Sequence, residues 1–344
     1  MLNSMYSGIS GLGANQKKLD VIGNNVANSG TTSFKSSSVT FQDSMYQSYK
    51  GASGPGLNLG GVNPSRVGMG VSIQSIVTNM AQGSLQPTGR PYDVAVDGTG
   101  YFIVAKGPDG GKITVNADQS MESTELESFY TRDGSFKVDT SGNLLNSNGY
   151  RIMGYAIKDD NSTDKKLSLE GKDANGNRVV NYVDGESAKL NAEQKELVPL
   201  KIPETVMKDG KEVRIQGFSI ENDGLIKAVL ADGSTTVLGQ VAMASFTNNE
   251  GLEQKGNNMY SPSANSGNPL ARVGKYDKTT GLPDKRIDNG KAYGQVLNGF
   301  LEMSNVDLSA QFTDMIVATR SFQACGKIIT TADEILQELV NLKR

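Results

Sequence analysis

The sequence predicts a mainly β protein framed by two long α-helices, one at each end of the chain. Apolar residues recur at alternating steps of three and four at both ends, whereas the middle changes to a period of two with frequent Asp-Gly and Asn-Gly turns. The composition agrees, since 40 glycines, 37% hydrophobic residues and no tryptophan suit a β protein with many turns. We expect the terminal helices to pair as a coiled coil, with discontinuous domains nested between them.

The first predicted helix covers residues 1 to about 29 and ends near Gly30. Its glycines each weaken it by roughly 0.5–1 kcal/mol relative to alanine. We therefore expect close approach of a neighbouring helix at Gly8, Gly11, Gly13 and Gly23. The seam that should face the partner helix consists of Leu2, Met5, Ile9, Leu12, Gln16, Leu19, Gly23 and Val26.

The middle of the chain predicts a linker, a discontinuous β domain and an insertion. Composition rich in Ser, Thr and Gly makes residues 31–70 a linker or extended hairpin. Period-two runs place the β domain at 71–157 and 216–303, with a hairpin over 92–104 that turns at Asp97-Gly98. The charged segment 158–215 predicts a small inserted outer domain, and a second charged excursion covers 271–291.

The last predicted helix follows Ser304-Asn305-Val306-Asp307, a sequence typical of a helix N-terminal cap, and runs to about Asn341. Together with the cap, residues 304–344 join residues 1–30 in one terminal helical domain. At about 1.5 Å per residue the two helices would be rods of roughly 50 and 40 Å. The seam of the last helix consists of Leu308, Gln311, Met315, Ala318, Phe322, Cys325, Ile329, Ala332, Leu336 and Leu339.

The composition argues against most catalytic and binding classes. The absence of histidine removes histidine metal sites, the common nucleophile–base pairs and the usual general base near pH 7. Cys325 lies on the seam and is interpreted as a small buried hydrophobe. A formal charge of −3 argues against nucleic acid as the main partner. We expect no catalytic residue, no cofactor and no metal site.

Other motifs are interpreted structurally. Gly98-Thr99-Gly100 lies in a predicted turn and lacks the third glycine of a dinucleotide fingerprint. A calcium loop over residues 173–178 fails because Arg178 stands where the loop needs glycine. No apolar run reaches 18 residues, so we expect no membrane insertion, and the first residues lack the pattern of a cleaved signal peptide.

Five strings in order along the chain resemble the bacterial flagellar rod and hook axial proteins. The first spans residues 19–35 (LDVIGNNVAN, then TTSFK), the second residues 83–102 (GSLQPTGRPYD, then GYF), and the third residues 129–145 (FYTRDGSF, then GNLL). The fourth and fifth, SNVDL at 304–308 and ATRSFQA at 318–324, belong to the last helix. Together they leave uncovered only the linker and the two excursions.

The resemblance implies a structural subunit of the flagellar hook, a curved helical tube that transmits torque, with the distal rod protein of the basal body as the alternative. It implies self-association through the terminal helices and contacts with the distal rod protein, the hook cap, the hook–filament junction proteins and the flagellar export apparatus. It places the protein outside the cell, exported without a cleaved signal peptide. Inner packing would rest on Leu12, Leu19, Ile22, Val26, Met315, Phe322, Ile329 and Leu336, while Asn24, Asn25 and Asn28 would end the first helix and bond neighbouring backbone.

Three alternatives remain open on the sequence. The helices could form a hairpin packed inside one ordinary domain. The chain could be a secreted β-rich adhesin with a helical stalk, or a glycosidase that uses a carboxylate pair. Because the two helices are marginal as an isolated pair, we expect mobile ends in a monomer and ordered ends in a polymer.

Overall fold

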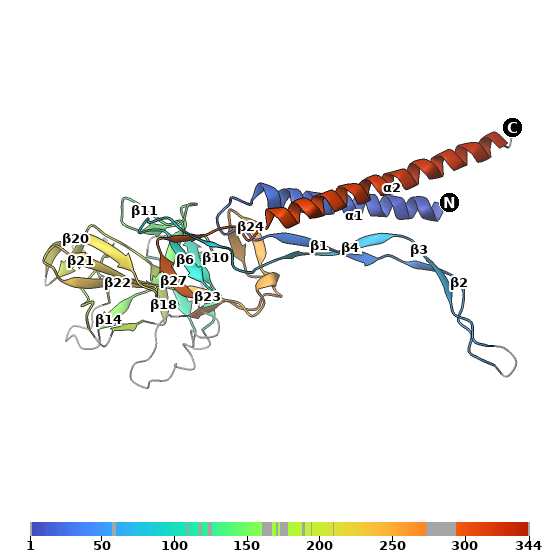
Figure 1. Cartoon of the computed structure of the whole chain (residues 1–344). Coiled ribbons are helices and arrows are strands. Elements are labelled where there is room, and N and C mark those ends of the chain that lie inside the picture. The colour runs from blue at the N-terminus through green and yellow to red at the C-terminus, as the bar shows by residue number, and fades with distance from the viewer. Residues whose placement is uncertain are drawn as a thin grey trace. The chain divides into compact units, whose positions relative to one another are not determined.

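A computed structural model describes residues 2–56, 60–108, 110–116, 119–122, 126–159, 167–169, 171–172, 178–187, 190–193, 195–208, 210–272 and 294–342. The chain divides into two compact units. Unit 1 consists of residues 1–81 and 304–344 and contains both helices and strands β1 to β4. Unit 2 consists of residues 82–303 and contains strands β5 to β28 (Figure 1). The prediction of a mainly β chain with a helix at each end is confirmed.

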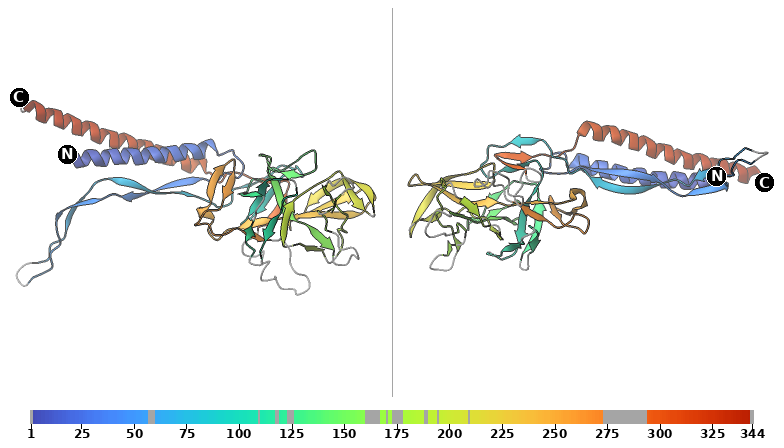
Figure 2. Two further views of the ribbon diagram at one scale, coloured as in Figure 1. Left: turned by 180° about the vertical axis from the view of Figure 1, so that it is seen from behind. Right: turned by 90° about the horizontal axis from the view of Figure 1, so that it is seen from below.

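The two helices of unit 1 are α1 (Leu2–Ala27) and α2 (Leu308–Leu342), and they lie antiparallel, side by side (Figure 2). Asp307 caps α2, because its side-chain Oδ1 accepts hydrogen bonds from the backbone N–H of Ser309 and Ala310. The cap lies within the predicted motif, and α2 ends one residue beyond the predicted end.

A long two-stranded ribbon completes unit 1. Strand β1 (Ser37–Asp43) pairs with β4 (Val71–Thr78), and β2 (Tyr46–Lys50) pairs with β3 (Ser65–Gly68), all antiparallel. The structure differs here from the expected start of the β domain at residue 71. The alternation correctly predicted a strand here but not its partner, because β4 pairs with the preceding strand β1 and not with the strands that follow.

The ribbon packs against α1. The Val71 backbone N–H donates to the Ser10 hydroxyl at 3.3 Å. Gly70 lies beside it with a φ of 116°, and a side chain there would overlap Ser10. Glycine at position 70 is therefore required by both the backbone conformation and the space.

Hydrogen bonds from a half-buried and a buried side chain hold the base of the ribbon together and connect it to the segment before α2. The Asn305 amide nitrogen donates to the carbonyl oxygens of Asn79 and Ala81, and its oxygen accepts the Ser36 N–H. Lys35 is only 1% exposed and its Nζ donates to the same Ala81 carbonyl at 2.8 Å. Such satisfied buried groups fix one geometry, because leaving any of them unpaired would carry the full desolvation penalty.

The described part of unit 2 consists of strands and a 3-10 turn, η1 (Asn249–Gly251). Its strands are β5 (Leu85–Pro87), β6 (Val94–Asp97), β7 (Tyr101–Lys106), β8 (Ile113–Val115), β9 (Met121–Glu122), β10 (Glu127–Thr131), β11 (Lys137–Val138), β12 (Leu144–Leu145), β13 (Arg151–Tyr155), β14 (Ile157–Asp159), β15 (Gly171–Lys172), β16 (Arg178–Val179), β17 (Leu190–Ala192), β18 (Glu196–Pro199), β19 (Thr205–Lys208), β20 (Lys211–Ile220), β21 (Leu225–Leu230), β22 (Thr235–Val241), β23 (Met243–Ser245), β24 (Glu253–Gly256), β25 (Met259–Ser261), β26 (Leu270–Arg272), β27 (Gln295–Asn298) and β28 (Phe300–Glu302).

The largest sheet of unit 2 runs in the order β19-β20-β21-β22-β13-β7-β10-β25-β24, and the pairs along it are antiparallel. Strands β20, β21 and β22 form a meander in this sheet, with Gly224 and Gly233 at positive φ in its turns, while β23 pairs with β7 and β26. A continuous core lies under the sheet, and its fully buried side chains include Phe102, Phe136, Ile152, Leu144 and Val104.

Two expectations for the β region are wrong. The predicted hairpin over residues 92–104 does not form, because β6 pairs with β27 while β7 pairs with β10, β13 and β23. The segment 158–215 does not form a separate domain in its described parts. There Leu169, Val180 and Val198 belong to the same core as the surrounding strands. Residues 273–291 of the second excursion and Asp173, Asn175 and Asn177 lie outside the described residues.

A buried ion pair lies near both ends of unit 2. Arg132 Nη1 lies 3.5 Å from Glu302 Oε1, and both side chains are almost fully buried. Glu302 also accepts the Gly83 N–H, and Arg132 donates to the carbonyls of Gly98 and Gly100. Since β28 pairs with β5, this network joins the chain where it enters unit 2 to the chain where it leaves.

Candidate assembly interface

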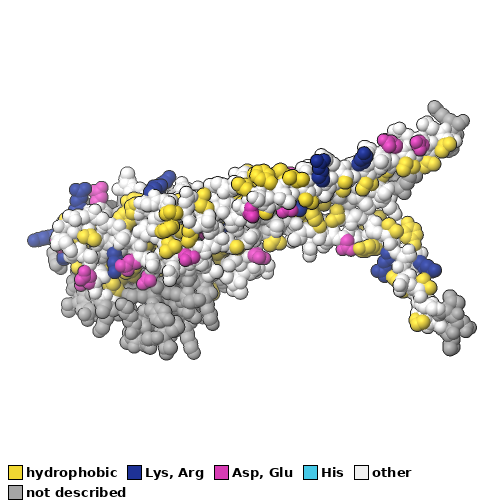
Figure 3. All heavy atoms as spheres, viewed as in Figure 1, with side chains coloured by type: hydrophobic (Ala, Val, Ile, Leu, Met, Phe, Trp, Pro, Cys, Tyr) yellow, Lys and Arg dark blue, Asp and Glu magenta, His cyan; other side chains and the backbone are white. Residues whose placement is uncertain are grey.

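The exposed apolar surface of the chain is concentrated in unit 1. Among the described residues, every large hydrophobic side chain that is exposed belongs to unit 1, with the single exception of Val229. Conversely, Ala14, Ile22, Ala318 and Ala332 are the only buried hydrophobic residues of that unit among those described. Figure 3 shows apolar side chains along both α2 and the ribbon. Apolar surface of this extent is unusual for a monomer and typical of an interaction surface.

The predicted seam of α2 faces α1. Ala318 and Ala332 are 1% and 6% exposed, and Met315, Ile329 and Leu336 are half-buried. At the edge of this face Phe322 stays 38% exposed. The 3-4 spacing therefore identified the correct face of this helix. Because α2 is the longer helix, its last turns extend beyond α1, and there Leu339, Val340 and Leu342 are 49%, 67% and 82% exposed.

The predicted seam of α1 does not face α2. The residues of α1 that meet α2 lie one position earlier along the helix and are small or polar. Lys18 Nζ pairs with Asp314 Oδ1 at 3.1 Å, and Asn25 donates to Gln311 Oε1 at 3.0 Å. We call the four α1 residues that contact α2, namely Gly8, Gly11, Lys18 and Asn25, the α1 contact line.

Two of the four helix glycines are explained by this packing. A Cβ on Gly11 would lie 2.8 Å from Cys325 Sγ, and one on Gly8 would lie 3.1 Å from Ile329 Cγ1. Gly13 and Gly23 have no atom within 4 Å of the Cβ position. The expected close approach therefore occurs at the first two glycines only.

The remaining predicted residues of α1 lie around this line. Ile22 is 4% exposed, while Leu12, Leu19 and Val26 are half-buried. Leu12, Leu19 and Val26 belong to a stripe that is turned by one residue from the contact line, whereas Ile22 lies on the line itself, between Lys18 and Asn25. A seam predicted by apolar spacing thus lies beside the glycine-containing line that makes the contact, because glycines and polar side chains carry no hydropathy signal.

The three asparagines at the end of α1 have different surroundings. Asn25 is fully buried; its side chain donates to the Ser37 carbonyl at 2.7 Å and accepts the Ser37 N–H at 3.0 Å, as a neighbouring strand would. The side-chain nitrogen of Asn28 donates hydrogen bonds to the backbone carbonyl and to the side-chain oxygen of Asn24. Asn24 itself is exposed. No sequence pattern indicated that Asn305 bonds the base of the ribbon, although this residue lies within the cap motif at 304–307.

The outer half of the ribbon adds exposed aromatic surface. Tyr46 and Tyr49 on β2 are 56% and 65% exposed, Met45 is 73% exposed, and Val67 on β3 is 44% exposed. A two-stranded ribbon of this kind is marginal in water by itself. Its exposed side chains belong to the same apolar surface as those of the helices.

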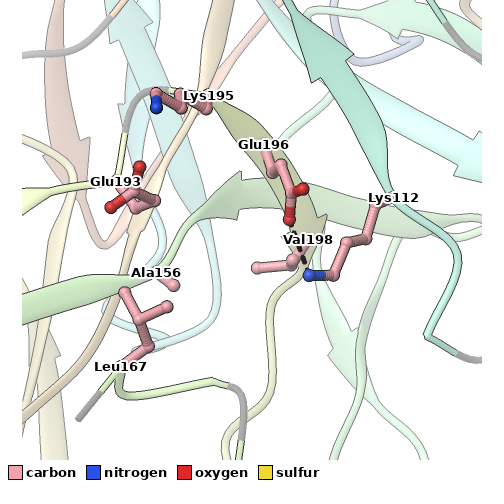
Figure 4. A pocket seen from close by; sticks show the side chains of 7 residues that line it. All are labelled: Lys112, Ala156, Leu167, Glu193, Lys195, Glu196 and Val198. Atoms are coloured by element: carbon pink, nitrogen blue, oxygen red, sulfur yellow. Dashed lines mark hydrogen bonds and ion pairs between the residues drawn. The ribbon is translucent and has the colours of Figure 1, made fainter.

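A pocket of about 310 Å³ in unit 2 offers no comparable chemistry (Figure 4). Its acidic residues are paired with lysines: Glu196 with Lys112 at 2.6 Å, and Glu193 with Lys158 at 3.3 Å. Within the described residues no group of three His, Cys, Asp or Glu side chains could hold a metal ion. Over the same residues, neither helix is apolar enough over sufficient length to cross a bilayer.

Apolar surface on paired helices and a ribbon, beside a unit with its own complete core, defines a class of protein that functions by association. Comparison with known proteins agrees. Family models match at residues 5–35 (flagella basal body rod protein), 95–228 (D1 domain of flagellar hook protein FlgE/F/G) and 297–342 (C-terminal segment of flagellar basal body rod FlgEFG protein).

Two relatives are similar over their full lengths. The flagellar basal-body rod protein FlgG of Bacillus subtilis is 38% identical over 344 residues, covering 100% of both chains. The flagellar hook protein FlgE of Borreliella burgdorferi is 30% identical over 473 residues, again covering 100% of both chains. The chain belongs to the family of flagellar rod and hook axial proteins, which are structural proteins of the flagellum.

Proposed function

We propose that this protein is a structural subunit that polymerises into an axial tube of the flagellum through unit 1. The observation that carries the proposal is the distribution of apolar surface: unit 2 buries its hydrophobic residues, whereas unit 1 exposes them on α1, α2 and the ribbon. Burying apolar surface stabilises association by roughly 25 cal/mol per Å² before the costs of ordering. Copies of the chain would thus supply the partners that unit 1 lacks.

Two segments of the flagellar axis are candidates. The rod is favoured by the Bacillus relative, whose alignment spans 344 residues without a large insertion. The hook, favoured by the sequence patterns, has support from the Borreliella relative, whose alignment spans 473 residues and therefore contains extra segments. In either place the resemblance implies neighbours such as the distal rod protein, the hook cap and the hook–filament junction proteins, and export through the flagellar channel.

Electron microscopy of the purified chain under assembly conditions tests the proposal. Tubes are the expected result, curved for a hook subunit and short and straight for a rod subunit. Removal of residues 1–29 or of residues 306–344 should leave a monomer with an intact β spectrum and no tubes. Tubes formed by either truncated protein would disprove assembly through unit 1. Glycan binding by the protein without tubes would instead support the adhesin alternative.

A further inference from the structure

Each helix of unit 1 carries an apolar stripe that remains partly exposed within the chain. On α1 the contact line faces α2, and Ser7 and Ser10, one position before its glycines, lie against Gly70 of the ribbon. The residues one position after the contact line lie beside these contacts: Ile9 is 54% exposed, and Met5, Leu12, Leu19 and Val26 are half-buried. We define the α1 seam as the apolar residues of this stripe, Met5, Ile9, Leu12, Leu19 and Val26; Gln16 and Gly23 occupy its other two positions.

On α2 a second stripe runs beside the seam that faces α1, displaced by one residue toward the N-terminus. It keeps the 3-4 spacing over about 27 Å at 1.5 Å per residue. Val317, Ile328 and Ile335 are 54%, 45% and 47% exposed, so neither α1 nor the ribbon covers them. We define the α2 flank as Val317, Ser321, Ala324, Ile328, Thr331 and Ile335.

The α1 seam and the α2 flank lie on opposite faces of the helix pair. Two antiparallel helices are related by a twofold axis perpendicular to the plane that contains them. Positions displaced in the same direction along each sequence therefore lie on the same face. The α1 seam lies one residue after the α1 contact line, whereas the α2 flank lies one residue before the α2 seam that faces α1. The α1 seam and the α2 flank therefore lie on opposite faces of the helix pair. The ribbon lies on the face of the α2 flank.

The geometry points to the α1 seam of one copy packing on the α2 flank of the next copy. This inference rests on the proposed function and names the two surfaces that would meet. Heptad spacing selects a helix as the occupant, and α1 and α2 of one chain already occupy each other's contact faces. Since the two stripes lie on opposite faces, the contact is heterologous, and each added copy presents a free stripe to the next.

Charge and size agree with such a contact. Neither stripe contains an ionisable side chain, so burying both carries no penalty for desolvating a charge. Glu338, the next position of the α2 flank, ends the stripe. Leucine and isoleucine dominate the α1 seam, whereas the α2 flank alternates branched residues with Ser321, Ala324 and Thr331. Such alternation gives holes into which larger side chains can insert.

Cross-linking between full-length copies tests the contact. In a Cys325→Ser background, one copy carries Ile9→Cys and the other carries Val317→Cys, Ile328→Cys or Ile335→Cys, which scans the register. The mixture is assembled and treated with a short bismaleimide. A matched control carries Thr330→Cys, which is exposed on the other flank of α2. We expect mixed dimers for at least one α2 flank position, and no more than background cross-linking for the control or for either copy alone.

Charge variants give a second readout. Ile9→Asp disables the α1 seam and Ile328→Asp disables the α2 flank, while circular dichroism checks that the helices persist. Each variant alone should form no tubes, and an equal mixture should stop at dimers because a single functional contact remains. Tubes from either variant, or tubes without mixed cross-links, would overturn this contact and leave the proposed function intact. Failure of the unaltered chain to form any polymer would overturn both.

Discussion

At the residue scale, buried and half-buried polar side chains set the geometry of both units. The Asn25 side chain hydrogen-bonds the backbone N–H and C=O of Ser37, as a neighbouring strand would. Asn305 connects the segment before α2 to the base of the ribbon, and Arg132 forms an ion pair with Glu302 inside unit 2. These groups contribute less net stability than apolar burial but penalise every alternative arrangement that leaves them unpaired.

Replacement of Asn25 should destabilise unit 1. Asn25→Ala leaves both backbone groups of Ser37 without their partner, at about 1–3 kcal/mol for a buried unsatisfied group. We expect a loss of about 2–3 kcal/mol in the free energy of unfolding of unit 1, followed by its helical dichroism. Asn24→Ala is the control, because Asn24 is exposed, and should cost no more than about 0.5 kcal/mol. Equal effects of the two substitutions would contradict the assigned role.

Alkaline titration should reveal the buried tyrosines of unit 2. Burial raises the pKa of Tyr101 and of Tyr130 to about 12, above the value of about 10 for tyrosine in an unfolded chain. Both phenols keep their protons to higher pH in the folded state than in the unfolded state. Their contribution to the free energy of unfolding is therefore fully present below about pH 10 and is lost as the pH rises toward 12.

Absorbance at 295 nm measures this titration without interference, since the chain has no tryptophan. A late fraction of tyrosinate should appear near pH 12 together with loss of the β spectrum, and Tyr101→Phe should reduce that fraction. Titration of every tyrosine near pH 10 while the fold persists would show that these phenols are not shielded.

At the element scale, glycines decide as much as hydrophobic residues which face of α1 packs against α2. Gly8 and Gly11 let α1 approach α2 closely, and this choice leaves the leucines of the α1 seam on an adjacent, partly exposed face. The α1–α2 pair is therefore built around small residues, whereas the large ones remain at its margins.

Alanine substitutions at two glycines of α1 should have opposite effects. Gly11→Ala places a methyl group 2.8 Å from Cys325 Sγ and should cost about 1–3 kcal/mol through overpacking. Gly13→Ala has open space and should add roughly 0.5–1 kcal/mol of helix stability. Thermal melts followed at 222 nm compare the two.

A compensating substitution isolates the cause. Cys325→Ala removes the sulfur and leaves its Cβ 3.9 Å from the new methyl group. Gly11→Ala combined with Cys325→Ala should therefore recover most of the stability lost in Gly11→Ala alone. If the double variant is as unstable as the sum of the two single variants, the clash is not the cause.

At the scale of the whole molecule, the two units differ in where their stability originates. Unit 2 has an extensive buried core, whereas unit 1 exposes apolar side chains on both helices and on the ribbon. Association that buries the surface of unit 1 stabilises its folded form by mass action without changing unit 2.

Thermal unfolding of the dilute chain should therefore occur in two steps. The helical signal should be lost before the β signal, and it should shift to higher temperature on assembly while the β transition stays in place. Circular dichroism at two wavelengths, at low and at assembly concentration, gives the comparison. A single transition at both concentrations, with both signals coincident, would argue against independent units.

Local sequence patterns suffice to predict the terminal helices, the period-two middle and the side of α2 that faces α1. Each is encoded by local spacing and turn residues, which act over a few positions. Only the tertiary structure decided that β4 returns to β1, that β6 leaves its sequence neighbour for β27, and that Gly8 and Gly11 turn the α1 seam away from α2. Strand partners and helix faces depend on pairs of residues far apart in the chain, and no local period records them.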